Sequence, residues 1–191
     1  MDKRILLCKP EVAGTELKYI NEALADDWIT PLGPHVDRFE AKLEQQLSTD
    51  GQPVHVCALS AGTAAIHIGL DLLGVRPGDE VICSSFPFAA SANPIVYLGA
   101  KPVFVDSEPS TWNMSPELLR MAIEDRITHT GHSPRAIVVA ELYGMPAKMD
   151  EIMDIAREYR IPVLEDSAEA LGSCYKGRPC SSLADVGTLS F

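Results

Sequence analysis

Short apolar runs alternate with amphipathic helical patterns along most of this sequence, and this alternation constrains the fold more than any other feature. Strand-like runs are expected at 54–59, 80–84, 101–106, 135–142 and 161–166, with helices at 63–74, 89–98, 115–127 and after position 150. Strands joined by helices run parallel, and the helices then cover both faces of the sheet. The sequence therefore predicts an α/β fold with a mostly parallel sheet.

Two more amphipathic helices are expected before the first strand, at 14–27 and 35–47. We interpret residues 1–50 as an N-terminal helical segment that leads into a large domain over 51–191. At the other end, residues 172–191 are expected to form two short β runs around a turn at Lys176–Gly177, the second run continuing to the end.

Composition excludes several functional classes. Lys plus Arg number 16 against 27 Asp plus Glu, and the net charge of −11 argues against a nucleic-acid or anionic-membrane surface. The sequence has no signal-peptide pattern and no uncharged apolar stretch of the ~18 residues that a membrane span needs. Five scattered cysteines without a C-x-x-C pair indicate neither disulfides nor a zinc site. We expect a cytoplasmic protein that binds no metal.

The carboxyl ends of parallel strands are where ligands bind in such sheets, so the residues that follow each run are candidate site residues. Ser60-Ala61-Gly62-Thr63 follows the first run and opens directly into a helix. The free N–H groups of that first helical turn could hold a phosphate without a basic side chain. The alternative is that Ser60 or Thr63 merely caps the helix.

An aromatic residue follows the next strand. Phe88 lies a few residues after the run at 80–84, where an exposed ring could stack on a planar heterocycle. Packing into the core is the alternative for this residue.

Three carboxylates follow the apolar run at 161–164, namely Glu165, Asp166 and Glu169. Burying an anion is costly unless a cation or N–H group pairs with it, and the sequence offers no obvious partner. The carboxylates could cap a helix, bind Mg²⁺, or pair with a protonated ring nitrogen of a cofactor.

Residues 59–106, the stretch ELYGMPAKMDEI at 141–152 and residues 161–191 together resemble the DegT/DnrJ/StrS family of pyridoxal-phosphate (PLP) nucleotide-sugar aminotransferases. The resemblance implies the large domain of a fold-type I PLP transferase, truncated before the C-terminal domain. It also implies a homodimer that transfers an amino group from an amino-acid donor, usually glutamate, to a keto group of a nucleotide-linked sugar.

The same resemblance implies roles for three residues around the coenzyme ring. Asp166 matches the aspartate that pairs with the pyridine nitrogen, and its charge keeps that nitrogen protonated. Phe88 matches the aromatic residue that stacks on the ring. Glu169 matches a ring-side partner, at a position where many members carry His or Gln.

For the coenzyme phosphate, the resemblance implies that Gly62 and Thr63 form the binding turn and that Ser190 supplies a nearby hydroxyl. The Schiff-base lysine of the family lies a few residues beyond the position that matches Phe191, so it is absent from this chain. We therefore expect this segment by itself to be inactive.

Two other functions stay open at this point. One is a sugar dehydratase of the same family, which uses pyridoxamine phosphate and carries His in place of the lysine. The other is a noncatalytic α/β module that holds a phosphorylated ligand. The nucleotide, the sugar, the aminated carbon, the oligomeric state, the pathway and the residue at the Schiff-base position are left undecided.

Overall fold

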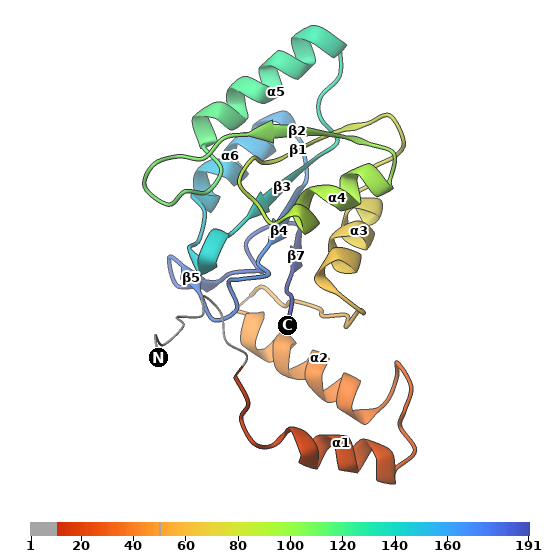
Figure 1. Ribbon diagram of the computed structural model, residues 1–191. Coiled ribbons are helices and arrows are strands. Elements are labelled where there is room, and N and C mark those ends of the chain that lie inside the picture. The colour runs from red at the N-terminus through yellow and green to blue at the C-terminus, as the bar shows by residue number, and fades with distance from the viewer. Residues whose placement is uncertain (1–10, 50) are drawn as a thin grey trace, which may run out of the picture.

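The computed structural model describes residues 11–49 and 51–191, and its centre is a five-stranded sheet (Figure 1). The strand order is β2-β1-β3-β4-β7, and every neighbouring pair is parallel. The strands are β1 (Glu80–Ser84), β2 (Lys101–Val105), β3 (Ala136–Ala140), β4 (Val163–Asp166) and β7 (Val186–Thr188). The predicted parallel sheet is thus confirmed.

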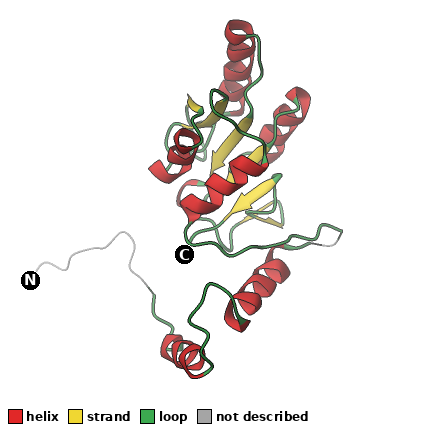
Figure 2. Ribbon diagram, turned by 90° about the vertical axis from the view of Figure 1, so that its right-hand side faces the viewer, coloured by secondary structure: helices red, strands yellow, loops and turns green. Residues whose placement is uncertain are grey.

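Helices cover both faces of this sheet, as expected (Figure 2). On one face, α3 (Gly62–Leu72) and α4 (Ala89–Tyr97) pack Ile66, Leu70 and Ile95 against the strands. On the other face, α5 (Pro116–Thr130) and α6 (Met149–Tyr159) bury another apolar cluster. Because both faces are covered, the central strand β3 is apolar and buried at all five positions rather than alternating.

Local capping explains where α5 begins and ends. The Ser115 hydroxyl accepts a hydrogen bond from the Leu118 N–H at 3.3 Å, and Pro116 occupies the first turn, where its missing N–H costs nothing. The helix runs three residues beyond the predicted end, to Thr130, because Gly131 terminates it in the left-handed conformation with a φ of 74°.

The two N-terminal helices, α1 (Glu16–Ala25) and α2 (Pro34–Leu47), lie outside the sheet and its covering helices (Figure 1). No residue of α1 is buried, whereas α2 buries Leu43 and Leu47. The Phe39 ring of α2 meets the ring of Phe191 edge-on, with 5.3 Å between centroids.

The strand expected at 54–59 does not form. These residues pair with no strand in the described part of the chain, and their N–H groups bond instead to side chains of α2 and its end. Ser48 accepts from Val54, Glu44 from Val56 and Glu40 from Ala58, at 3.0, 3.1 and 2.7 Å. An extended segment becomes a strand only when a neighbouring backbone supplies partners, and here side chains take that place.

The last residues also differ from expectation. A short antiparallel pair, β5 (Cys174–Tyr175) and β6 (Arg178–Pro179), does flank the Lys176–Gly177 turn. The second run, however, ends at Pro179, and the separate strand β7 joins the main sheet beside β4. A single-turn 3₁₀ helix, Leu142–Gly144, follows β3.

Among residues 11–49 and 51–191, no helix has both the length and the apolar character that crossing a membrane requires.

Candidate active site at the carboxyl ends of the strands

The strand order places a crevice next to the predicted site residues. From β1 the chain crosses to β2 on one side, whereas β3, β4 and β7 follow on the other side. In open α/β sheets this change of direction leaves a ligand-binding crevice outside the carboxyl ends of the strands. Phe88 follows β1, Asp166 ends β4, and Ser190 follows β7, so the three lie along this edge.

Asp166 is buried at the end of β4, and its hydrogen-bond partners among the described residues are uncharged. Its side chain is 6% exposed. The Ser91 hydroxyl of α4 donates to Oδ2 at 2.5 Å, and the Ala168 N–H donates to Oδ1 at 3.3 Å.

Burial raises the pKa of the Asp166 carboxyl, the two hydrogen bonds oppose that rise, and the nearby charge of Glu169 adds to it. No cationic side chain in the described ranges forms an ion pair with Asp166. A buried acid of this kind favours a cationic ligand atom, because such an atom would supply the missing partner charge.

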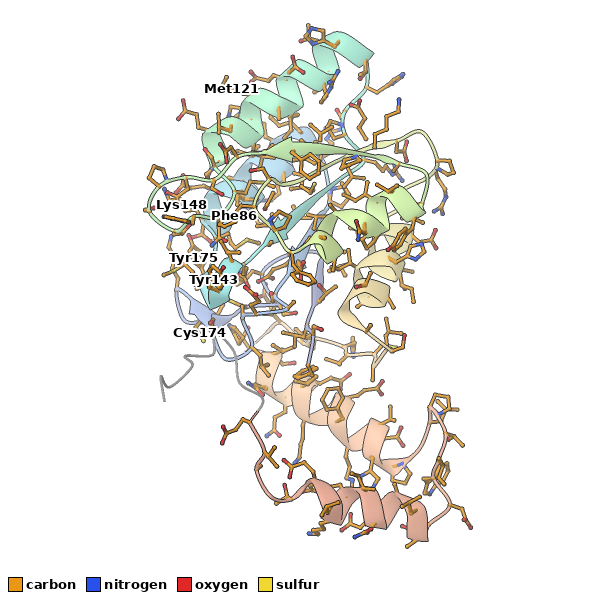
Figure 3. The ribbon with its side chains drawn as sticks, viewed as in Figure 1. Phe86, Met121, Tyr143, Lys148, Cys174 and Tyr175 are labelled. Atoms are coloured by element: carbon orange, nitrogen blue, oxygen red, sulfur yellow. The ribbon has the colours of Figure 1, made fainter. Side chains whose placement is uncertain are left out.

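Phe88 stands at the entrance to α4, three residues before Ser91. It is the N-cap residue of that helix and is 77% exposed, so it does not pack into the core. Phe86, two residues earlier, is also exposed and lies near Trp112, with 6.2 Å between ring centroids. In the view of Figure 3, Phe86 lies above Tyr143 at the same side of the molecule.

The beginning of α3 is open to an anion. Its N-cap residue is Ala61, and no side chain caps the helix, so the alternative in which Ser60 or Thr63 serves as a cap is wrong. The first-turn N–H groups and the positive end of the helix dipole together suit a phosphate.

Gly62 and Ser190 come into direct contact at this helix terminus. A Cβ atom added to Gly62 would lie 2.9 Å from the Ser190 Cβ and 3.0 Å from its Oγ. Real Cβ atoms essentially never approach that closely, so a glycine is needed to let the Ser190 hydroxyl reach the helix terminus. The resemblance implied only that both residues lie near the coenzyme phosphate, and this contact joins positions more than 120 residues apart in the chain.

Glu169 points to a backbone turn. Its Oε2 accepts a hydrogen bond from the Tyr143 N–H at 2.5 Å, and Tyr143 has a left-handed φ of 53°. The adjacent Gly144 leaves no room for a side chain, because an added Cβ would lie 2.9 Å from the Glu169 carbonyl oxygen. Glu169 thus holds a strained turn whose Tyr143 ring is exposed (Figure 3).

A groove of about 780 Å³ borders part of this edge. It is lined by residues 51–62 and by residues 181–191, except Leu183, with α2 and Ala65 contributing the rest. Gly62 and Ser190 belong to its lining, whereas Thr63, Phe88, Asp166 and Glu169 do not. The structure therefore arranges the predicted residues as two groups, one around Gly62 and Ser190 and one around Asp166.

The sequence analysis did not single out two buried polar residues near this edge of the sheet, Ser91 and Glu141. Ser91 carries no motif of its own, although a small hydroxyl residue one turn into the helix after Phe88 was a usable signal. Glu141 follows β3 and is 1% exposed. Its burial could not be predicted from the sequence, because its hydrogen-bond partner, Ser167, lies 26 positions away.

The residues present fit pyridoxal phosphate. An uncapped helix terminus with a glycine and a hydroxyl suits the phosphate. A buried aspartate that pairs with no cation among the described residues suits a protonated ring nitrogen.

Comparison with known proteins agrees with this geometry. The DegT/DnrJ/EryC1/StrS aminotransferase family matches residues 10–191. EpsN of Bacillus subtilis, whose name assigns it provisionally to the pyridoxal phosphate-dependent aminotransferases, is 47% identical over 191 residues, covering 100% of this chain and 48% of EpsN. The GDP-perosamine synthase of Escherichia coli O157:H7 is 39% identical over 189 residues, covering 99% of this chain and 49% of that protein.

A solved structure shows the same architecture. Spr1654 from Streptococcus pneumoniae, named provisionally as a sugar aminotransferase and solved in its PLP form, superposes with a TM-score of 0.87 at 31% identity. The match covers 99% of this chain and 49% of that one, so this chain spans about half the length of the relatives it matches. By the match over residues 10–191, this chain belongs to the DegT/DnrJ/EryC1/StrS aminotransferase family.

Proposed function

We propose that the full-length protein is a PLP-dependent aminotransferase that moves an amino group from an amino acid, glutamate being the expected donor, to a keto group of a nucleotide-linked sugar. The observation that carries this proposal is the buried Asp166 carboxylate, which has hydrogen bonds from Ser91 and Ala168 but no cationic partner in the part of the chain that the structure describes. Support also comes from the names of the relatives, which include a GDP-perosamine synthase.

In this proposal Asp166 holds the positive charge on the coenzyme's ring nitrogen. When bound, PLP supplies the electron sink that amino transfer requires. Ser91 keeps the Asp166 carboxylate oriented through its short hydrogen bond. The N–H groups of α3 and the Ser190 hydroxyl hold the phosphate, with Gly62 and Thr63 forming the turn.

Phe88 and Glu169 have supporting roles in the same proposal. The exposed Phe88 ring is available to stack on the coenzyme, because its position at the N-cap of α4 keeps it out of the core. Glu169 acts through the turn at Tyr143, since its carboxylate accepts the Tyr143 N–H. It is thus a positioning residue near the ring.

We further propose that residues 1–191 alone are inactive, with the Schiff-base lysine supplied by sequence that follows position 191. The division into an N-terminal helical segment over 1–50 and a PLP-binding domain over 51–191 is part of the same proposal. It is supported by α1 and α2, which lie outside the covered sheet (Figure 1).

The test uses the full-length protein. PLP titration followed by absorbance should show saturable binding, and incubation with ¹⁵N-glutamate and keto sugars linked to GDP, UDP or dTDP should yield a ¹⁵N-labelled amino sugar by mass spectrometry. Loss of water from the sugar without nitrogen transfer would establish the dehydratase instead. Reversible binding of phosphorylated ligands with no reaction would establish the noncatalytic module.

We also propose a cytoplasmic homodimer. The free state of the four described cysteines, Cys57, Cys83, Cys174 and Cys180, is consistent with a reducing compartment. Exposed apolar side chains on α1 and the segment after it, including Leu17, Ile20, Leu24, Ile29 and Leu32, are available for a subunit contact. Light scattering of the full-length protein and cell fractionation test the two parts separately.

A further inference from the structure

Two carboxylates are buried together on the sheet face opposite Asp166. Side chains alternate along β4, so Glu165 points toward the α5–α6 face, whereas Asp166 points toward α4. Glu165 is 0% exposed and Glu141, which follows the neighbouring β3, is 1% exposed. One ligand-type atom from each of Glu141, Glu165 and Cys180 lies within 4.8 Å of the others.

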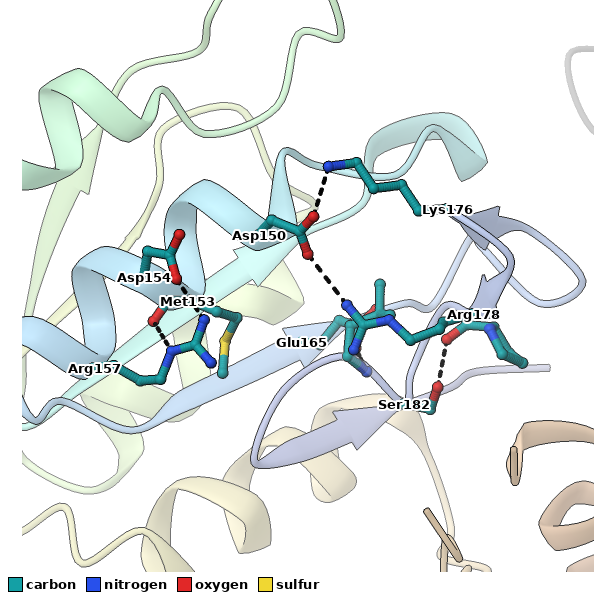
Figure 4. Close-up of polar contacts among 10 residues, drawn as sticks. Asp150, Met153, Asp154, Arg157, Glu165, Lys176, Arg178 and Ser182 are labelled. Carbon is teal, nitrogen blue, oxygen red and sulfur yellow. Dashed lines mark hydrogen bonds and ion pairs between the residues drawn. The ribbon is translucent and has the colours of Figure 1, made fainter. Parts of the chain in front are cut away.

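Glu165 has the hydrogen-bond pattern of an ionised carboxylate. Its Oε1 accepts the Ser181 N–H at 2.7 Å, and its Oε2 accepts the Leu183 N–H at 2.9 Å. Both oxygens therefore face donors, and a proton on either one would oppose a backbone N–H. Figure 4 shows Glu165 beside the segment that carries Arg178 and Ser182.

Glu141 has the opposite pattern. Its Oε2 accepts the Ser167 hydroxyl at 2.8 Å, but its buried Oε1 has no hydrogen-bond partner among the described residues. An unpaired carboxylate oxygen in the core is costly, whereas a protonated oxygen would have an acceptor nearby in Glu165.

Among residues 11–49 and 51–191, no cationic side chain pairs with either of the two carboxylates. The ionisable groups that act on Glu141 are Glu165 and the Cys180 thiol, whose own pKa burial raises so that it stays protonated. The two cations of the β5–β6 pair, Lys176 and Arg178, both bond to the Asp150 carboxylate of α6, at 2.6 and 3.3 Å (Figure 4).

Other charged groups on the neighbouring segments are engaged elsewhere. On the segment before α6, Lys148 pairs with Glu108 at 3.0 Å, and before β7, Asp185 accepts the Val163 N–H at 2.8 Å. On α5, Arg120 pairs with Glu158 of α6 and Arg126 with Glu80 of β1.

We propose that Glu141 and Glu165 hold one proton between them, which Oε1 of Glu141 carries and donates to Glu165. Glu141 is then a neutral positioning residue for two segments, the one that follows β4 and the one that precedes β7. Burial first, and the charge of Glu165 second, raise the pKa of Glu141 to about 8. The proposal does not rest on the proposed function.

The shared proton links two segments that reach the candidate active site. Through Ser167, Glu141 fixes the residue directly after Asp166, and through Ser181 and Leu183, Glu165 fixes the segment that leads into β7 and Ser190. Release of the proton to solvent would leave two buried negative charges in contact, and these segments would loosen.

The sign of the pH dependence follows from the raised pKa. The folded state keeps the Glu141 proton that the unfolded chain loses above its ordinary pKa of 4.5, so stability falls as pH rises from there to about 8. Across that pH window, each unit by which the pH rises should raise the unfolding equilibrium constant by up to about tenfold, because the unfolded chain has already lost this proton.

The experiment compares full-length wild type with Glu141→Gln. The glutamine keeps a donor toward Glu165 and an acceptor for Ser167 but cannot titrate. Infrared difference spectra between about pH 6 and about pH 10 should show one carboxylic-acid carbonyl band lost in wild type and absent from the variant. Urea midpoints should show a weaker decline with pH in the variant.

Glu165→Gln is the matched comparison, because it makes the same chemical change on the partner. Its amide donor would face the Ser181 or Leu183 N–H, so it should unfold at lower urea than Glu141→Gln at neutral pH. Equal urea midpoints for the two variants, or an unchanged acid band in Glu141→Gln, would overturn the proposal. Metal analysis that finds a stoichiometric ion in wild type and none in Glu141→Gln would overturn it too.

Discussion

The Ser91 hydroxyl donates a hydrogen bond of 2.5 Å to Oδ2 of Asp166 and so joins the first turn of α4 to the end of β4 across 75 positions. This bond favours the ionised carboxylate, against the burial that favours the neutral one. The balance between the two decides over what pH range Asp166 can pair with a cationic ring nitrogen.

Ser91→Ala removes that bond in the full-length protein. The pKa of Asp166 should then rise further. As the pH is lowered, PLP affinity should therefore begin to fall at a higher pH in the variant than in wild type. At neutral pH the loss should be several-fold, from the ~0.5–1.5 kcal/mol of one hydrogen bond. Fluorescence titration of PLP at a series of pH values measures this. Ser182→Ala, which removes only a hydroxyl bonded to the Pro179 carbonyl, should leave the profile unchanged.

Asp166→Asn tests the charge itself. The amide cannot balance a protonated ring nitrogen, so PLP affinity should fall roughly 10- to 100-fold, which corresponds to the ~1.5–3 kcal/mol of a charged hydrogen bond. The acid-side pH dependence of binding should also disappear, because the titrating group is gone. Asp154→Asn makes the same change at an exposed carboxylate paired with Arg157 and should bind PLP normally. Normal PLP binding by Asp166→Asn would remove the basis of the proposed function.

Gly62→Ala should close the phosphate site. The added Cβ would lie 2.9 Å from the Ser190 Cβ, so either the helix terminus or Ser190 must move. We expect at least a tenfold loss of PLP affinity, from more than ~1.4 kcal/mol of lost contacts.

Combining that change with Ser190→Gly gives a double-mutant cycle. Removing the Ser190 side chain relieves the clash, so the double variant should bind PLP better than Gly62→Ala alone, with a coupling of about 0.5–3 kcal/mol. Strictly additive losses would show that the two residues do not meet in the full-length protein.

Glu108→Gln tests a buried acid away from the site. Glu108 is 7% exposed; burial raises its pKa, but bonds from Ser110, Thr111 and Lys148 outweigh burial, so the net shift is downward. Its stabilisation is therefore present above the ordinary pKa of 4.5 and is lost as pH falls below it.

At neutral pH the Glu108→Gln variant should lose about 1–3 kcal/mol of unfolding free energy, and the difference from wild type should shrink in acid. Urea unfolding at several pH values measures both effects. Glu158→Gln, at an exposed carboxylate paired with Arg120, should show almost no change at any pH.

Much of the fold was predictable because its signals are local. The apolar run that became β3 and the helical periodicity that became α6 each lie within one stretch of sequence. The same alternation placed Asp166 and Phe88 at the carboxyl ends of strands. Whether those residues bind a coenzyme stays a prediction.

The sequence by itself thus determined the parallel sheet, its covering helices and the edge at which candidate residues gather, because hydrophobic period and turn residues act over short distances. Only the tertiary structure decided that 54–59 lacks a strand partner, that β7 joins β4, that Ser91 meets Asp166, and that Glu141 meets Glu165. Each of these depends on which distant backbone or side chain arrives alongside, and the cost of burying an unpaired polar group then selects the partner.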